Sequence, residues 1–474
     1  MKKTTLKRSA ALALAAGMVA GLTACSGGSS ATTTAAATTA AAATAAATEA
    51  AKETEAAKET EAAKETEAAK SEGLVAEEGA KIEITYWEGS TSDKDAWDVV
   101  IANLKKDHPE IEIVAQTYPS SSYRDQLDTR IAGNDWPDVM RYTYQRLGKF
   151  KEADVMLDLT PYISQESLDD LVPAFLSGCS YEGKVVAMPH HVDTVALFYN
   201  KKMFEEQGIR IPTSPDDAYT WDEVHDIAKQ LKEAYDLPYG CAGIWENGSG
   251  YRYLPFVYMN GGAILSEDQS EITFDSPETL EAIKWYEDMR KEDLIANTGL
   301  TAPSTANSLF VAQQIAFDFA GSWHMSYMQE NMPDNWGVTY MPQVDGKTSS
   351  DMGGNGIFAY AGTKYPKAAA IVVDYITSAE QAKAFCEAGS FIPVRTSLLE
   401  EGLSYNSFAD EMDTFLEIVG TIDPKMCADE TSVKFQQINT IFSEEMDPMV
   451  VDGSATAEEV IANCVERMNE ALND

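Results

Sequence analysis

The stretch from Tyr181 to Gly208 limits the fold more than any other part of the chain, because two short apolar strands there are joined by a polar link. Glu182-Gly183 favours a tight turn, since glycine accepts positive φ without steric cost. The pattern then predicts a strand over 184–188, ended by Pro189, which has no ladder donor. The next segment, His190-His191-Val192-Asp193-Thr194, is polar and typical of neither helix nor strand.

A second apolar strand is predicted over 195–199, directly after the polar link. Asn200 is a candidate N-cap for a short helix over 201–207. Gly208 suits the left-handed residue that commonly ends a helix. The stretch therefore reads as strand, link, strand and capped helix.

Strands and helices alternate from residue 81 onward. The predicted order is strand 81–87, helix 93–106, strand 111–116, helix 123–132 and a strand opening at 137. This alternation indicates a parallel sheet with crossover helices. Ligands of such sheets meet the carboxyl ends of the strands, where this chain carries Trp87, Glu88 and Tyr142.

The order Y-x-G-K, strand, proline, polar link, strand ending in Y-N-K and helix ending in glycine resembles the extracellular solute-binding proteins (family 1) of ABC importers. It most resembles their carbohydrate-binding branch, typified by maltose-binding protein. Two further segments are similar to that family: 309–323, which ends in Gly-x-Trp, and Gly353-Gly354-Asn355-Gly356, which resembles the return crossing between lobes. Gln314 and Ile315 depart from the family, which usually has a glycine and a small residue there. The resemblance covers about residues 81–474.

The resemblance implies a two-lobed α/β periplasmic-binding-protein fold. Each lobe is then expected to hold a mainly parallel sheet flanked by helices, with the ligand cleft between the lobes. The expected first lobe is 81–192 plus 354–403, and the second is 193–353 plus 404–474. The implied function is capture of a sugar or oligosaccharide by hinge closure and delivery to an ABC permease, by a monomer that needs no cofactor.

Sugars present apolar faces that stack on aromatic rings and hydroxyl edges that need paired donors and acceptors. Carried over from the family, Trp323 and Tyr251 match sugar-contacting aromatics of the second lobe, Tyr142 matches one in the first, and Asp193 matches an acidic residue at the crossing. Trp87, Glu88 and Trp245 complete the predicted ligand-binding set. Each aromatic could instead be plain core, and Asp193 could instead cap the hinge.

The first 80 residues predict export and anchoring. Residues 1–24 carry a basic start and an apolar run that is short for a membrane span, and Leu22-Thr23-Ala24-Cys25 matches a lipoprotein signal box. Cys25 is therefore the expected lipidation site, with the alternative of an ordinary secretory signal. Residues 26–80 contain no aromatic residue and include three AAKETE repeats, which is typical of a spacer. The folded part is expected at the outer face of the cell membrane.

Loss of four basic residues with the signal would change the formal net charge from −40 to −44. A charge of this size argues against nucleic-acid partners, because neutralising phosphates requires Lys and Arg. It fits the binding of a neutral or cationic solute.

Other functional classes find less support. Asp193 and Glu88 could form the two-carboxylate pair of a glycan hydrolase or lyase, but in a chain with 76 acidic residues such pairs are common. His190-His191 lacks a third ligand at helical spacing, so we expect no metal site. The five cysteines after Cys25 show no metal-binding spacing and suit buried small hydrophobes, although one or two disulfides stay open. We predict a binding protein rather than an enzyme; an added role in receptor-coupled sensing also stays open.

Overall fold

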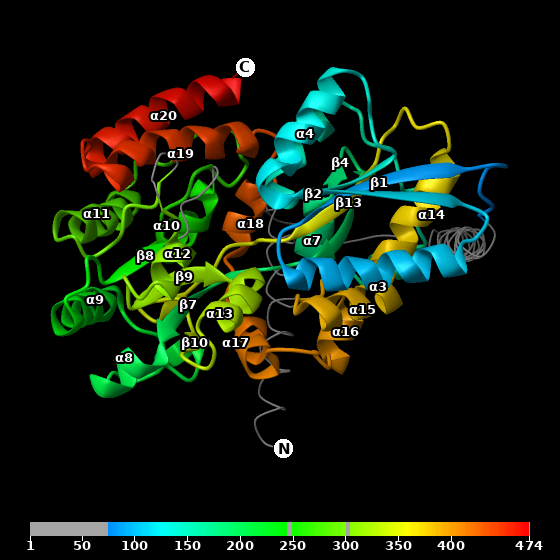
Figure 1. Cartoon of the computed structure of the whole chain (residues 1–474). Helices are drawn as coiled ribbons and strands as arrows, with labels where there is room; N and C mark the ends of the chain where they lie inside the picture. Colours follow the sequence, from blue (N-terminus) through cyan, green and yellow to red (C-terminus); the bar gives the residue numbers. More distant parts are fainter. Residues whose placement is uncertain (1–73, 244–248, 300–303, 474) are drawn as a thin grey trace, which may run out of the picture.

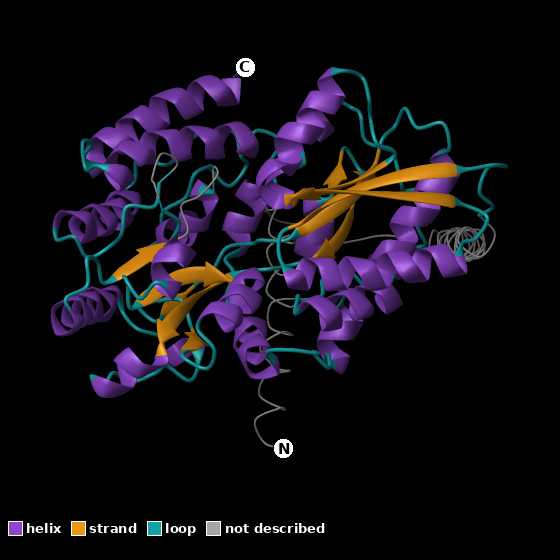
Figure 2. Cartoon of the chain, viewed as in Figure 1, coloured by secondary structure: helices purple, strands orange, loops and turns teal. Residues whose placement is uncertain are grey.

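The computed structural model describes residues 74–243, 249–299 and 304–473. Two lobes lie side by side, and each is built around its own β-sheet with helices on both sides (Figure 1, Figure 2). The two-lobed α/β architecture predicted from the sequence is therefore confirmed.

The first lobe surrounds a five-stranded sheet in the order β2-β1-β3-β13-β6. Its strands are β1 Lys81–Glu88, β2 Glu112–Pro119, β3 Val139–Thr143, β6 Met188–His191 and β13 Asn355–Ala359. Strands β2, β1 and β3 run parallel, as their alternation with helices predicts, whereas β13 is antiparallel to β3 and β6. The helices α3 (Thr91–Asp107) and α4 (Ser120–Ala132) form the crossovers.

Helix α3 shows how this lobe is held together. Ser90 caps its start by accepting from the Asp93 N–H, which satisfies one of the free donors of the first turn. Trp97, Val100 and Leu104 follow at helical spacing and are fully buried. The Trp97 indole stacks on Tyr86 of β1 with ring centroids 4.1 Å apart. This apolar face fixes the helix against the sheet.

The second lobe surrounds a four-stranded sheet in the order β10-β7-β9-β8. Its strands are β7 Val195–Asn200, β8 Cys241–Gly243, β9 Phe317–Gly321 and β10 Trp336–Thr339. Only β8 and β9 are parallel; β7 is antiparallel to both of its neighbours. The expectation of a mainly parallel sheet is wrong for this lobe, because its strands come from distant segments and the alternation that indicates parallel pairing covers only the start of the first lobe.

Two amphipathic helices, α9 (Trp221–Tyr235) and α11 (Pro277–Lys291), cover the second lobe. Thr220 and Glu223 have the spacing of a capping box, and the box is present at the start of α9, with each side chain bonding the other residue's backbone N–H. The remaining elements of this part are α8 Lys201–Glu206, η2 Pro215–Asp217, η3 Gly250–Tyr253, α10 Leu254–Met259, α12 Ala306–Val311, η4 Ser322–His324, α13 Met325–Asn331, β11 Gln343–Val344 and β12 Lys347–Thr348.

The C-terminal helices pack mainly on the second lobe but also reach the first. Helix α19 (Phe435–Val451) packs on α20 (Ala457–Asn473), α11 and η3, and on η1 (Tyr144–Arg146) and α5 (Gly148–Glu152) of the first lobe. Other helices and strands of the two lobes are α6 Gln165–Asp169, α7 Pro173–Gly178, β4 Ser180–Tyr181, β5 Lys184–Val185, α14 Pro366–Thr377, α15 Ala379–Gly389, α16 Thr396–Glu401, α17 Ala409–Val419 and α18 Pro424–Glu430.

The chain leaves one sheet and enters the other at residues 192–194, which we call the crossing. The predicted strand over 184–188 is wrong, because β5 ends at Val185 and β6 runs from Met188 through Pro189 to His191. Pro189 is tolerated within β6 because β6 is an edge strand, where a missing N–H costs no ladder bond. The Asn200 cap and the positive φ of Gly208 are confirmed.

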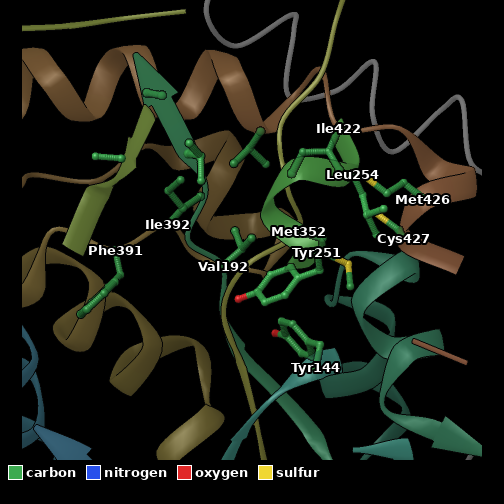
Figure 3. Packing of buried hydrophobic residues seen from close by; sticks show 14 of the residues in the cluster. Tyr144, Val192, Tyr251, Leu254, Met352, Phe391, Ile392, Ile422, Met426 and Cys427 are labelled. Atoms are coloured by element: carbon green, nitrogen blue, oxygen red, sulfur yellow. The ribbon is translucent and has the colours of Figure 1, made fainter. Parts of the chain in front are cut away.

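Apolar side chains from both lobes surround the crossing (Figure 3). Val192 and Met352 of the return segment 349–354 lie near the rings of Tyr144 from the first lobe and Tyr251 from the second, and all four are buried (Figure 3). The Val192 N–H donates to the Ile392 carbonyl at 2.9 Å. The hinge region is therefore packed rather than open.

Within the described ranges no helix is long and apolar enough to span a bilayer. The five cysteines in these ranges are buried and unpaired, which confirms their interpretation as small apolar side chains. Cys25 lies outside the described residues.

Candidate functional site

The main cavity is a cleft of about 620 Å³ between the lobes. Residues from both lobes line it, among them Trp87, Asp93 and Arg141 from the first and Asp193, Arg252 and Trp323 from the crossing and second lobe. The lobes also meet beside it, since the Ser92 hydroxyl of α3 and the Ser326 hydroxyl of α13 are 2.6 Å apart.

Asp193 stands at the crossing and is 8 % exposed. Its Oδ1 has no hydrogen-bond partner, which is unusual for a buried carboxylate oxygen. Burial raises the pKa of Asp193 to about 7, opposed by the positive charge of Arg252. A Cβ on Gly353 would lie 1.9 Å from Oδ1, so only glycine fits beside this carboxylate. Asp193 thus lines the cleft, and its buried Oδ1, which faces Gly353, has no hydrogen-bond partner.

Arg141 organises the first-lobe wall from within β3. Its guanidinium pairs with buried Asp93 at 2.9 Å and lies 3.9 Å from the ring centroid of Trp87, a cation–π distance. It also lies 3.5 Å from His191 Nε2. These contacts fix the indole of Trp87, which lies near the carboxyl end of β1.

In the second lobe, Arg252 likewise pairs with a buried aspartate and lies over a tryptophan ring. Its guanidinium pairs at 2.5 Å with Asp351 of the return segment and lies 4.1 Å from the ring centroid of Trp323. Trp323 packs against Gly321, where a Cβ would lie 1.9 Å from the ring. The Gly-x-Trp spacing is therefore a packing requirement, because the indole occupies the space of the missing side chain.

A second cavity of about 200 Å³ adjoins the cleft. It shares Trp87 and Arg252 with the cleft and is further lined by Tyr142 and Tyr251. We call it the side pocket.

The structure brings part of the predicted set together. Trp87, Asp193 and Trp323 line the cleft, while Tyr142 and Tyr251 line the side pocket. Tyr142 is mainly core, 1 % exposed and packed edge-on against Phe150. Glu88 lines neither cavity, and Trp245 lies outside the described residues.

Sequence reasoning missed both arginines of the cleft. Arg141 interrupts the apolar strand V-M-R-Y-T, and Arg252 stands between two tyrosines in a buried aromatic segment. A charged residue inside an otherwise apolar run is a signal for a buried, paired charge, but the sequence does not say which acid pairs with it.

The geometry gives little support to a two-carboxylate catalytic site or to a metal site. Glu88, the carboxylate suggested as a partner for Asp193, is not in the cleft. His190 and His191 are fully buried against Phe385, and burial followed by the charge of Arg141 lowers the pKa of both. No group of three His, Cys, Asp or Glu side chains suited to a metal ion occurs among the described residues.

Two α/β lobes joined by crossing strands, with a polar and aromatic cleft between them, define the class of two-lobed binding proteins. A sequence model of the bacterial extracellular solute-binding proteins matches residues 88–383, and the chain belongs to this family.

Individual relatives are distant. The chain is 25 % identical over 300 residues to the maltotriose-binding protein of Pyrococcus abyssi. This alignment covers 62 % of each of the two chains, so the chain spans less than two thirds of that relative's length. It is 22 % identical over 424 residues to the sn-glycerol-3-phosphate-binding periplasmic protein of Rhizobium meliloti, covering 84 % and 96 %.

Solved structures share the fold over nearly their whole length. The GacH receptor of Streptomyces glaucescens, with acarbose complexes, superposes with a TM-score of 0.70 at 22 % identity, covering 84 % of this chain and 100 % of that one. A substrate-binding protein of Listeria monocytogenes in complex with cycloalternan gives 0.71 at 22 % identity, covering 83 % and 99 %.

Proposed function

We propose that this chain is the extracytoplasmic solute-binding lipoprotein of an ABC importer, that it captures a sugar or oligosaccharide between its lobes, and that it hands the ligand to the permease. The observation that carries the proposal is Asp193, a carboxylate that lines a cleft bordered by Trp87 and Trp323. An acceptor for hydroxyls between aromatic walls is the chemistry that a sugar ring needs.

The relatives support a carbohydrate or polyol ligand in general terms. One is named for a neutral trisaccharide and another for a phosphorylated polyol, so family membership leaves the charge of the ligand open. Membership also supports a binding role over catalysis. The anchor at Cys25, the monomeric state and the permease partner rest on the sequence.

The placement of the two walls supports hinge closure. Trp87 belongs to the first lobe and Trp323 to the second, so a ligand that touches both gains the full contact only when the lobes close. A ligand shifts such an equilibrium by its difference in affinity for the two states.

The test is a thermal-unfolding screen of the full-length protein, in detergent, against a panel of mono- and oligosaccharides. A sugar that binds only the folded state raises the unfolding midpoint, and chromatography of the incubated sugar should recover it unchanged. Stabilisation by amino acids or peptides alone would refute the substrate class. Turnover that Asp193→Asn abolishes would refute the binding role.

A further inference from the structure

The side pocket differs from the cleft in its charge. Three arginines line it, Arg124, Arg146 and Arg252, and no Asp or Glu is among its described lining residues. The cleft, in contrast, mixes two arginines with carboxylates. An arginine-lined cavity is the ordinary environment for a carboxylate or phosphate, because the guanidinium fork matches both anions.

Arg146 is the arginine that distinguishes this pocket. Arg252 forms an ion pair with Asp351, and Arg124 also has an interaction partner. Arg146 forms no ion pair with a described carboxylate; its environment is burial, the like charge of Arg124 and weaker influences from Tyr251, Tyr142 and Asp128. The carboxylate of Asp128 is held by Lys149 at 2.8 Å.

These surroundings disfavour the charge of Arg146. Burial, and then the positive charge of Arg124, lower its pKa to about 10. The side chain is still charged at neutral pH, so a cation is held in a partly desolvated place and forms no ion pair with the carboxylates that the structure describes. A bound anion would relieve both the desolvation and the repulsion.

The position of Arg146 suits a ligand contact. It ends η1, directly after β3, at the carboxyl edge of the first-lobe sheet. The pocket shares Trp87, Ser120, Thr143, Ser249 and Arg252 with the cleft, so one ligand can occupy both. Its volume of about 200 Å³ is below the roughly 300–1,000 Å³ of pockets that enclose whole ligands. It fits a substituent or one ring.

We propose that the side pocket is a subsite for an anionic substituent of the sugar, a carboxylate or a phosphate, and that Arg146 binds it. The inference rests on the proposed carbohydrate-binding function and narrows its substrate class to acidic sugars. The formal charge of −40 does not oppose it, because exposed charges beyond about 8 Å are largely screened at physiological salt.

The experiment is calorimetric titration of the full-length protein, in detergent, with matched sugar pairs. The neutral members are glucose, galactose, galactobiose and galactotriose; the acidic members are glucuronate, galacturonate, di- and trigalacturonate, and glucose 6-phosphate. We expect an acidic member to bind roughly ten- to hundred-fold more tightly than its neutral counterpart, the range for a charge-assisted contact. The uronate and phosphate arms distinguish the two anions.

Arg146→Met should weaken binding of the acidic sugar far more than binding of its neutral counterpart, and so remove the preference. Lys105→Met is the control, because it removes the same charge from an exposed residue that does not line the pocket; it should keep the preference. If Arg146→Met does not fold, Arg146→Lys replaces it, and it should reduce the preference because lysine lacks the forked donors.

The outcomes separate the two proposals. Binding of neutral sugars with no preference for acidic ones, or an equal effect of Arg146→Met on both, overturns the anionic subsite and leaves the sugar-binding function standing. Absence of binding to every sugar in the panel overturns both. A preference that survives Arg146→Met overturns the assignment to this pocket.

Discussion

The guanidinium of Arg252 lies 4.1 Å from the ring centroid of Trp323, and the same group pairs with Asp351 on the segment that returns to the first lobe. One side chain thus joins a wall of the cleft to the hinge. A change at the hinge that moves Asp351 would move Arg252 and, with it, the indole.

Arg252→Met should destabilise the protein and weaken ligand binding. Asp351 is fully buried, and removing one partner of a buried pair costs about 3–5 kcal/mol, since the other charge stays behind. Adding Asp351→Asn should recover most of the unfolding free energy but not the affinity. If the double variant regains both, Arg252 is only structural. Denaturant unfolding and calorimetry read the two effects separately.

Trp323→Ala should weaken sugar binding by roughly 1–3 kcal/mol, the range for a large apolar side chain, or about one to two decades in Kd. Small-angle scattering should show contraction of the wild type with ligand, and of the variant only at higher ligand concentration. Trp136→Ala is the control, because Trp136 stacks on Tyr360 and lines neither cavity. Equal losses in both variants would contradict a role for Trp323 in the cleft.

Asp193→Asn should weaken binding yet stabilise the free protein above neutral pH. The folded pKa of Asp193 is raised from 3.8 to about 7 by burial. The folded state then holds more protons than the unfolded state between these values, so stability falls as pH rises through this window. Between pH 4 and 8 the free energy of unfolding of the wild type should fall by on the order of 1–4 kcal/mol, and that of the variant should not show this fall. Unfolding of both proteins without ligand at pH 4, 6 and 8 checks this; parallel curves would show that Asp193 titrates normally.

Gly354→Ala should lower the unfolding midpoint sharply. Gly354 has φ +101°, and a Cβ there would lie 2.3 Å from the His191 carbonyl oxygen. Backbone strain alone should lower the free energy of unfolding by about 1–3 kcal/mol. Gly208→Ala is the matched control: φ is +66° but nothing lies within 4 Å of the added Cβ, so only the smaller strain remains. A variant at Gly354 as stable as the one at Gly208 would mean that the two crossing segments can separate freely.

Cys25→Ala should release the protein from the membrane fraction. Within the described part of the chain no helix could replace an acyl anchor. Metabolic labelling with a fatty acid and sedimentation after a high-salt wash test this. Retention of the label in the variant would contradict the lipidation of Cys25, and sedimentation of an unlabelled variant would show that something besides the acyl chains holds the protein at the membrane.

The sequence by itself determined the local elements. Asn200 caps its helix as the pattern predicts, and Ser90 and Thr220 cap theirs in the same way, because a cap needs only residues three positions apart. The motif around the crossing also identified the family, since the two sheets meet at residues that are close together in the chain. Asp193 lies in that motif, Trp87 stands at the end of a predicted strand, and Trp323 belongs to the Gly-x-Trp segment that resembles the family, so all three could be predicted as cleft residues.

Only the tertiary structure decided what each buried charge meets. Arg141 with Asp93, and Arg252 with Asp351, join segments 48 and 99 residues apart, and no local pattern encodes such pairs. The overall acidity suggested a neutral or cationic ligand, yet folding gathers Arg124, Arg146 and Arg252 around one small pocket. Composition gives the sum of the charges, whereas a ligand responds to those within a few ångströms, and their positions are set by packing.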